Sequence, residues 1–337
     1  MKINRSTFIT AVLIFVSMST TSAAETINQG TKLSFSGANS TQMYSNLDFN
    51  AAGGITGIRA ANFGGTDQFV SPVTYHGTSG MNGISWQGSI AGLHHNSPNS
   101  GDAGLNAVLS TGIHGPFSPP QIDITANPGS IYRVQLVVFS DFNNRQFDIF
   151  VDGNLYADEF ESFDVVYGVP THSIYSFNVT ADADGIDVDL GPGSVFDSNP
   201  FVQGIMVNML SKYTCIGFDA PLAKGPVKVN KKRALPLKMM LLDEAGNIVT
   251  EFLNDTPPVL QVLYSAHVSD TPTDVTTDAL GAGMGSEGNQ FELNDDGSWQ
   301  YNLKTNNYTA SGTYTVSVVL NSAYVLDTNC VASFVVK

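Results

Sequence analysis

Residues 131–160 read IYRVQLVVFSDFNNRQFDIFVDGNLYADEF, and this stretch decides the fold. Apolar side chains occupy alternate positions in 131–138 and again in 146–151. Such alternation is typical of half-buried β-strands, because neighbouring side chains point to opposite faces of a sheet. Turn-forming residues at 141–144 and at Asp152-Gly153 separate the segments. The stretch therefore predicts antiparallel strands at the centre of a β-sandwich.

Shorter segments of the same kind surround this ladder. Strands are predicted at 33–35, 43–44, 47–49, 175–179, 186–190 and around Ile205. The polar stretch from Gly77 to His114 has no periodicity and predicts long loops, where binding sites often lie. No amphipathic helix longer than two turns is expected. The sequence predicts an all-β fold, with a jelly-roll-like β-sandwich over residues 25–210.

The first 24 residues have the composition of a secretory signal peptide. Lys2 and Arg5 precede an apolar run from Phe8 to Val16, and small residues precede Glu25. The run is too short for a membrane-spanning helix, which needs about 20 apolar residues, and no later segment qualifies. We therefore expect a secreted protein, extracellular or periplasmic, with no membrane insertion.

Charge and cysteine content narrow the function further. The chain has 30 acidic and 15 basic residues, and its net charge of −15 becomes −17 once Lys2 and Arg5 are removed. Such acidity argues against nucleic-acid binding, which requires clustered basic residues. The two cysteines, Cys215 and Cys330, are expected to form a disulfide bond, as is usual for a lone pair in an exported chain.

Residues 211–337 have a different composition. Lysines become more frequent, and about seven strand-like segments are separated by turns such as Asn294-Asp-Asp-Gly297. That number of strands in a segment of this length fits an immunoglobulin-like β-sandwich. Pro236 lies within one predicted strand and indicates an edge or a bulge. The sequence thus predicts a second domain over 211–337.

The order of the strands predicts where a ligand would bind. If the strands of the first sandwich run antiparallel in succession, the connections 140–145, 161–171 and 191–200 gather at one end. They carry aromatic, carboxylate and amide side chains: Phe142, Asp164, Tyr167, Asp197 and Asn199. Aromatic rings pack on the apolar face of a pyranose, and its hydroxyl groups need fixed donors and acceptors. We therefore predict a carbohydrate-binding site at this end.

Three motifs in the first half resemble a malectin-like carbohydrate-binding domain. They are Arg145-Gln-Phe-Asp-Ile-Phe-Val-Asp-Gly153, Asp197-Ser-Asn-Pro-Phe-Val-Gln-Gly-Ile-Met-Val207 and Leu47-Asp-Phe-Asn-Ala-Ala-Gly-Gly54. The resemblance spans about 47–209. It implies that Asp197 contacts the ligand together with aromatic residues of earlier loops, for which the candidates are Tyr75, Trp86 and Phe117.

The second half resembles the PxKF domain, which is found at the ends of many exported bacterial proteins. The resemblance is carried by Leu235-Pro-Leu-Lys-Met239, Trp299-Gln-Tyr-Asn-Leu-Lys-Thr305 and Ser311-Gly-Thr-Tyr-Thr-Val316. It implies a spacer, stalk or docking module and no catalytic role.

Two patterns could indicate metal binding, but simpler interpretations are favoured. Asp182-Ala-Asp-Gly185, followed by Asp187 and Asp189, could bind calcium, although a solvated hairpin turn explains the same spacing. Structural calcium elsewhere in the sandwich stays compatible with the sequence, and no other cofactor is expected. The histidines at 76, 94, 95 and 114 could bind a metal ion, but their spacing does not establish convergent geometry. Ordinary surface histidines are the favoured interpretation.

An acid/base pair for glycoside hydrolysis is the main catalytic alternative. Asp158, Glu159, Glu161 and Asp164 could supply it. Acidic residues are abundant, however, so such clusters arise from composition alone. We therefore predict a non-enzymatic protein whose partner is a polysaccharide or glycoconjugate. The alternative is a structural or adhesive extracellular matrix or surface protein that binds other proteins.

Overall fold

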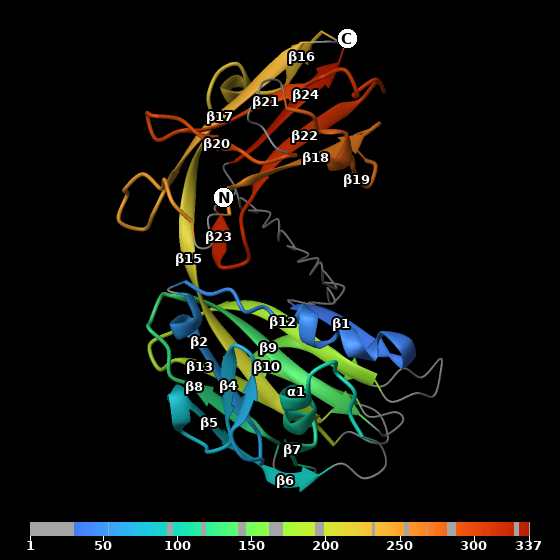
Figure 1. Ribbon diagram of the computed structural model, residues 1–337, viewed down its shortest axis with the longest axis vertical. Helices are drawn as coiled ribbons and strands as arrows, with labels where there is room; N and C mark the ends of the chain where they lie inside the picture. Colours follow the sequence, from blue (N-terminus) through green and yellow to red (C-terminus); the bar gives the residue numbers. More distant parts are fainter. Residues whose placement is uncertain are drawn as a thin grey trace, which may run out of the picture.

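The structure is a computed structural model in which two units of β-strands lie one above the other (Figure 1). It describes residues 30–52, 54–92, 97–115, 119–140, 146–161, 171–192, 199–230, 233–252, 256–267, 269–281, 288–326 and 330–336. The predominance of strands confirms the predicted all-β fold class. The predicted signal peptide lies outside the described residues.

The first unit is a sandwich of two sheets, here called sheet A and sheet B. Sheet A has the order β1 (Gly30–Ser36), β12 (Thr171–Thr180), β9 (Ile131–Ser140), β15 (Gly204–Phe218), β2 (Ile58–Asn62), β4 (Val73–His76) and β3 (Gln68–Val70). Sheet B has the order β11 (Asn154–Glu161), β10 (Gln146–Val151), β13 (Ile186–Pro192), β8 (Gln121–Ile124) and β5 (Ile84–Gln87). The quoted stretch thus supplies an interior strand of one sheet and the edge hairpin of the other.

The alternation in β9 and β10 builds the core between the sheets. Val134 and Leu136 of β9 and Phe147 and Ile149 of β10 belong to one buried cluster. On the other face of β9, Val137 and Phe139 are also buried, because this part of the outer face of sheet A is covered. Val137 packs there in a second buried cluster with residues from the turns at 37–46 and from helix α1 (Ala103–Val108).

Two predictions for the first half are wrong in detail. Residues 43–44 and 47–49 do not form strands, because Met43 lies between two short 3-10 turns, Gly37–Gln42 and Tyr44–Asn46, with its side chain fully buried. The stretch from Gly77 to His114 is not a continuous loop. It contains η4 (Met81–Gly83), β5, β6 (Ser89–Gly92), α1 and β7 (Thr111–His114), and β6 and β7 join β14 (Phe201–Val202) in a small third sheet. Strands of four residues are too short to show a period.

The second unit is another two-sheet sandwich, and β15 continues into it. In one sheet β15 pairs with β23 (Tyr324–Leu326) and with β17 (Ala234–Leu242), which is followed by β21 (Trp299–Lys304) and β20 (Glu292–Leu293). The other sheet has the order β16 (Val227–Val229), β24 (Val331–Val336), β22 (Thr313–Val319), β18 (Val259–Ser265) and β19 (Thr273–Asp274). Pro236 lies beyond Met239, the last residue of β17 paired with β15, as expected for a proline at a local edge.

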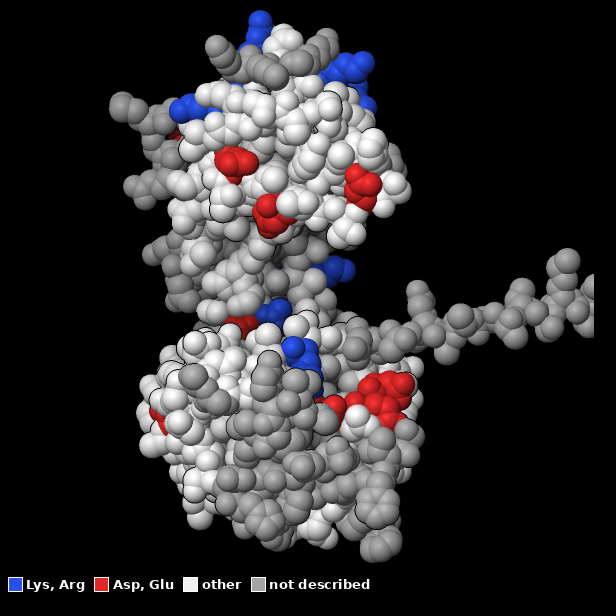
Figure 2. Space-filling view, turned by 90° about the vertical axis from the view of Figure 1, so that its right-hand side faces the viewer, with Lys and Arg blue, Asp and Glu red and all other residues white. Residues whose placement is uncertain are grey.

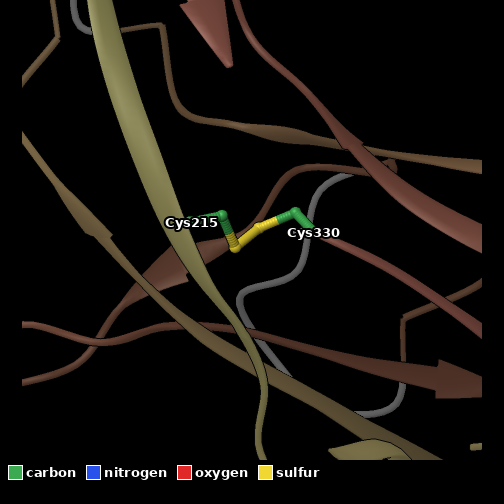
Figure 3. The surroundings of a disulfide bond; sticks show 2 residues. All are labelled: Cys215 and Cys330. Carbon is green, nitrogen blue, oxygen red and sulfur yellow. A yellow bond between two sulfur atoms is a disulfide. The ribbon is translucent and has the colours of Figure 1, made fainter. Parts of the chain in front are cut away.

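A disulfide bond fastens the second unit. Cys215 on β15 and Cys330, the residue before β24, are bonded with their Cα atoms 5.5 Å apart (Figure 3). This confirms the predicted pairing. Both cysteines belong to the buried core of the second unit, so the bond lies between its packed sheets.

The two units are joined by a shared strand and by a polar cluster. Along β15, Met209 packs against the first core and Tyr213 against the second, with no linker between them. Beside this strand, Arg133 forms an ion pair with Asp48 and donates a hydrogen bond of 2.8 Å to the carbonyl oxygen of Ser322. The Ser322 hydroxyl in turn donates to Asp48 at 2.9 Å. The domain boundary after residue 210 stays a prediction.

Candidate functional site

Three connections of the first unit begin and end at one end of the sandwich. Ser140 pairs with Thr171 in sheet A, while Gln146 pairs with Glu161 in sheet B. Pro192 pairs with Phe147, one residue further along β10. The ends of 140–145, 161–171 and 191–200 therefore gather as predicted, and we call this end of the first unit the loop end.

The loop end lies away from the second unit. β15 starts near it, because Gly204 pairs with Val137, and leaves the first unit at Leu210, which pairs with Ile131. Ile131 and Ser140 are opposite ends of β9, so the second unit is attached at the far side of the sandwich (Figure 1). A large ligand could therefore approach the loop end without meeting the second unit.

Most of the predicted ligand residues lie outside the described residues. These are Asp197, Tyr167, Asp164, Phe142 and Phe117. Asn199 is described, and it is partly buried two residues before β14. Its side-chain carbonyl oxygen is buried and has no hydrogen-bond partner among the described residues.

Two aromatic candidates pack on the buried clusters of the first unit. Tyr75 is fully buried in the core on the outer side of sheet A, and burial raises the pKa of its phenol well above the ordinary value. Its ring therefore offers no surface to a sugar. Trp86 is half-buried on β5, the strand of sheet B furthest from β11, and its ring centroid lies 5.1 Å from that of Phe63. Its indole packs on the first core.

A β-bulge in the hairpin of β10 and β11 brings three carboxylates together. Phe147 pairs with Phe160 and Ile149 with Ala157, so the single residue Asp148 lies opposite both Asp158 and Glu159. The backbone at residue 159 has a φ of +52° and donates a hydrogen bond of 3.0 Å from its amide to the Asp148 carboxylate. Burial is the main cause that raises the pKa of Asp148, and the two neighbouring carboxylates add to it.

A cavity of about 260 Å³ adjoins this bulge, and we call it the acidic hollow. It is lined by Gly30, Lys32, Ala157, Asp158, Glu159, Phe160, Glu161 and Tyr175. The Lys32 ammonium donates a hydrogen bond to the backbone carbonyl of Glu161 and lies 5.1 Å from the centre of the Phe160 ring. Because Glu161 ends β11, the hollow lies next to the loop end. Figure 2 shows the largest group of acidic side chains on the same, lower unit.

The acidic hollow can offer hydroxyl-bearing ligands several acceptors and one cationic donor. Phe160 and Tyr175 are buried, so they form its floor and leave no exposed ring for stacking. The oxygen atoms of Asp148, Asp158 and Glu159 lie within 4.8 Å of one another, a spacing at which three carboxylates could also hold a divalent cation.

The described residues of the other metal candidates contact groups of the protein. The Asp182 carboxylate accepts hydrogen bonds of 3.2 Å from the amides of Asp184 and Gly185, as in a hairpin turn. Among the described histidines, the His76 ring lies 3.1 Å from the Asp67 carboxylate, whereas His114 packs on Phe201. Within the described part of the chain, the only group with metal-binding spacing contains no histidine. His94 and His95 lie outside that part.

Comparisons with known proteins give low similarity. No protein-family model matches the chain, and no curated protein matches it in sequence. Among solved structures, the chain is similar to the ANX1 ectodomain of Arabidopsis thaliana, with 12% identity and a TM-score of 0.37 over 81% of this chain and 98% of that chain. It is also similar to the ANXUR2 extracellular domain of the same plant, with 16% identity and a TM-score of 0.33 over 44% of this chain.

The chain spans about half of the ANXUR2 structure, 48% of its length. A calcium-binding mutant of Bacteroides uniformis beta-glucuronidase 2 is similar over 45% of this chain and 18% of that chain, with 16% identity and a TM-score of 0.35. At these scores none of the likenesses supports an argument about function. Among the described residues, no helix is both long and apolar enough to cross a membrane.

Proposed function

We propose that this protein is a secreted, non-enzymatic carbohydrate-binding protein whose first unit binds a glycan at the loop end. The observation that carries the proposal is the convergence of three connections at the end of the sandwich that faces away from the second unit. Scaffolds of this kind place binding residues on loops held by rigid strands.

The residues near the loop end suit a sugar. Asn199 supplies a buried carbonyl acceptor, while the acidic hollow supplies carboxylates and the Lys32 ammonium. Sugar hydroxyl groups donate to such acceptors and accept from such donors. The predicted contacts Asp197, Tyr167, Asp164 and Phe142 belong to connections anchored at these strand ends. The malectin-like motifs support the same assignment.

The second unit fits a spacer or docking module. It contains a packed core of its own and a buried disulfide bond, which suits an oxidising compartment. The PxKF-like motifs and the signal-peptide-like start support export. The non-enzymatic assignment is part of the proposal, and a release of reducing sugar from a bound polysaccharide would overturn it.

A glycan array on the full mature chain tests the proposal. We expect a restricted set of glycans to bind, and we expect Asp197→Ala and Glu161→Gln to weaken that binding. Asp296→Ala, at an exposed position of the second unit, is the matched control and should leave it unchanged. Silence across the array, or equal binding by all three variants, would contradict the proposal and favour a structural or adhesive protein that binds other proteins.

A further inference from the structure

At the end of the first unit opposite the loop end, Arg59 lines a cavity of about 240 Å³. Arg59 lies on β2 next to η3 (Gly54–Gly57), and the cavity walls also include Thr125, Asn127, Tyr132 and Met209. The cavity is therefore separate from the acidic hollow and the loop end. Hydroxyl, amide and apolar groups around one guanidinium group form a lining suited to a small polar ligand.

The guanidinium group of Arg59 has no carboxylate partner among the described residues, in a chain with twice as many acidic as basic residues. Both of its hydrogen bonds start from Nη1, one to the carbonyl oxygen of Thr125 at 2.6 Å and one to that of Asn82 at 3.3 Å. They use the two hydrogens of this nitrogen. The Nε and Nη2 hydrogens form the edge that pairs with a carboxylate through two parallel bonds.

The orientation of Arg59 is fixed before any ligand arrives. Its Cζ atom lies 5.7 Å from the centre of the Tyr132 ring, which belongs to the first core. The Tyr132 hydroxyl accepts a hydrogen bond of 3.0 Å from the amide of Asn127, another wall residue. The ring and the two carbonyl groups hold the guanidinium group in place, so binding would require little ordering of the side chain.

Because Arg59 is partly buried, leaving its charge without a counter-ion costs free energy. Removal from water is the main effect on Arg59 and lowers its pKa; the Tyr132 phenol acts in the opposite direction, and no carboxylate does. A carboxylate ligand would restore the favourable environment, whereas a neutral ligand would not. The size of the cavity suits one small ring or a short acid and is too small for a longer oligomer.

We propose that this cavity is an anion subsite, in which Arg59 pairs with the carboxylate of a small organic acid such as a uronic acid unit. Thr125 and Asn127 then bind neighbouring hydroxyl groups, and Met209 packs on an apolar face. The subsite lies far from the loop end and does not depend on the proposed function, since it can bind a free acid whether or not the loop end binds a glycan.

Titration of the full mature chain with sodium glucuronate, monitored by the 15N–1H signal of the Arg59 side chain and by calorimetry, tests this assignment. We expect saturable binding and a shift of the Arg59 Nε–H signal, with glucose giving neither. Arg59→Lys keeps the charge but loses the paired geometry, and it should weaken binding by about tenfold or more. Arg233→Lys, on the second unit, is the control and should bind as the wild type does.

The alternative outcomes are decisive. Equal binding of glucose and glucuronate, or unchanged affinity in Arg59→Lys, would overturn the proposal. Sodium sulfate binding with no response to glucuronate would also overturn the carboxylate assignment. If Arg59→Lys does not fold, the wild-type titrations still test the proposal. The proposed site is refuted if the Arg59 Nε–H signal does not shift when glucuronate is added. Asp197→Ala should bind glucuronate normally, which distinguishes this subsite from the loop end.

Discussion

Replacing Arg133 by methionine should destabilise the first unit, because it removes one partner of the ion pair at the junction. The side chains of Arg133 and Asp48 are 20% and 13% exposed, so the remaining carboxylate would be left mostly out of water. The guanidinium group also donates to the side chain of Asn178 at 3.2 Å and to the backbone of Ser322 at 2.8 Å. Methionine preserves much of the volume and none of these bonds.

The magnitude follows from what remains bound to Asp48. Breaking a well-buried ion pair by removing one partner costs about 3–5 kcal/mol. Here three donors stay on the Asp48 carboxylate: the Ser322 hydroxyl at 2.9 Å and, at 3.0 Å each, the backbone and side-chain nitrogens of Asn50. They offset part of the loss, as does the residual contact with water, so we expect a decrease in the free energy of unfolding of about 2 kcal/mol.

The two tryptophans allow each unit to be followed separately. Trp86 reports on the first core and Trp299 on the second, so urea unfolding is measured by fluorescence in Trp299→Phe and Trp86→Phe backgrounds. The free energy of unfolding reported by Trp86 should fall by the full amount of about 2 kcal/mol. The value reported by Trp299 should fall by less, because the second unit loses only the hydrogen bond at Ser322. Lys238→Met is the control, since it breaks an exposed ion pair of 2.7 Å with Asp296. If Arg133→Met costs no more than this control, the reasoning is wrong.

Three further predictions concern single features. Replacing both Cys215 and Cys330 by alanine opens a loop with a sequence separation of 115 residues. The chain-entropy model then gives a decrease of about 4–5 kcal/mol in the free energy of unfolding of the second unit, measured by Trp299 fluorescence, and a decrease below about 1 kcal/mol would contradict this. Tyr75→Phe removes a buried hydroxyl that has no hydrogen-bond partner among the described residues, and it should be neutral or slightly stabilising. By contrast, Tyr175→Phe loses a bond of 2.6 Å to Tyr156 and should cost about 1 kcal/mol, so the reverse order in urea unfolding would refute both accounts. Burial lowers the pKa of His172 to about 4, below its value of about 6.5 in the unfolded chain. Between these two pH values the unfolded state binds more protons than the folded state, so stability is lost as the pH falls from 6.5 to 4. The glutamine side chain in His172→Gln can still accept the hydrogen bond from the Asn99 amide, and this variant should lose less stability than the wild type between pH 6.5 and 4. If the unfolding free energies of the two proteins, measured by Trp86 fluorescence, depend on pH in the same way, the burial of His172 is contradicted.

The main features of the fold could be predicted from short-range patterns. Alternation in 131–151 was sufficient to predict β9, β10 and the core that they enclose, because a period of two is visible over six or more residues. The expectation of export and the cysteine count were sufficient to predict the disulfide bond. The order of the strands also predicted that three connections share one end, since antiparallel succession leaves few other arrangements.

The chemistry of the site was harder to predict, because it depends on residues far apart in sequence. From the sequence, Tyr75 was a candidate loop residue that could contact a sugar. In the structure, a layer that includes Met43 and Leu105 buries its side chain completely. Asp148 was missed because a β-bulge changes the pairing by one residue, which periodicity does not record. Lys32 was missed because β1 lies next to β12 only in space.

The continuity of β15 determines how the protein would respond to mechanical load. A pull on the second unit is transmitted along the axis of this strand into the middle of sheet A, between β9 and β2. The ladder bonds run across that axis, so such a force shears all of them together and cannot open them one by one. If a glycan held the loop end while the second unit was anchored elsewhere, tension would pass through a strand that is paired on both sides.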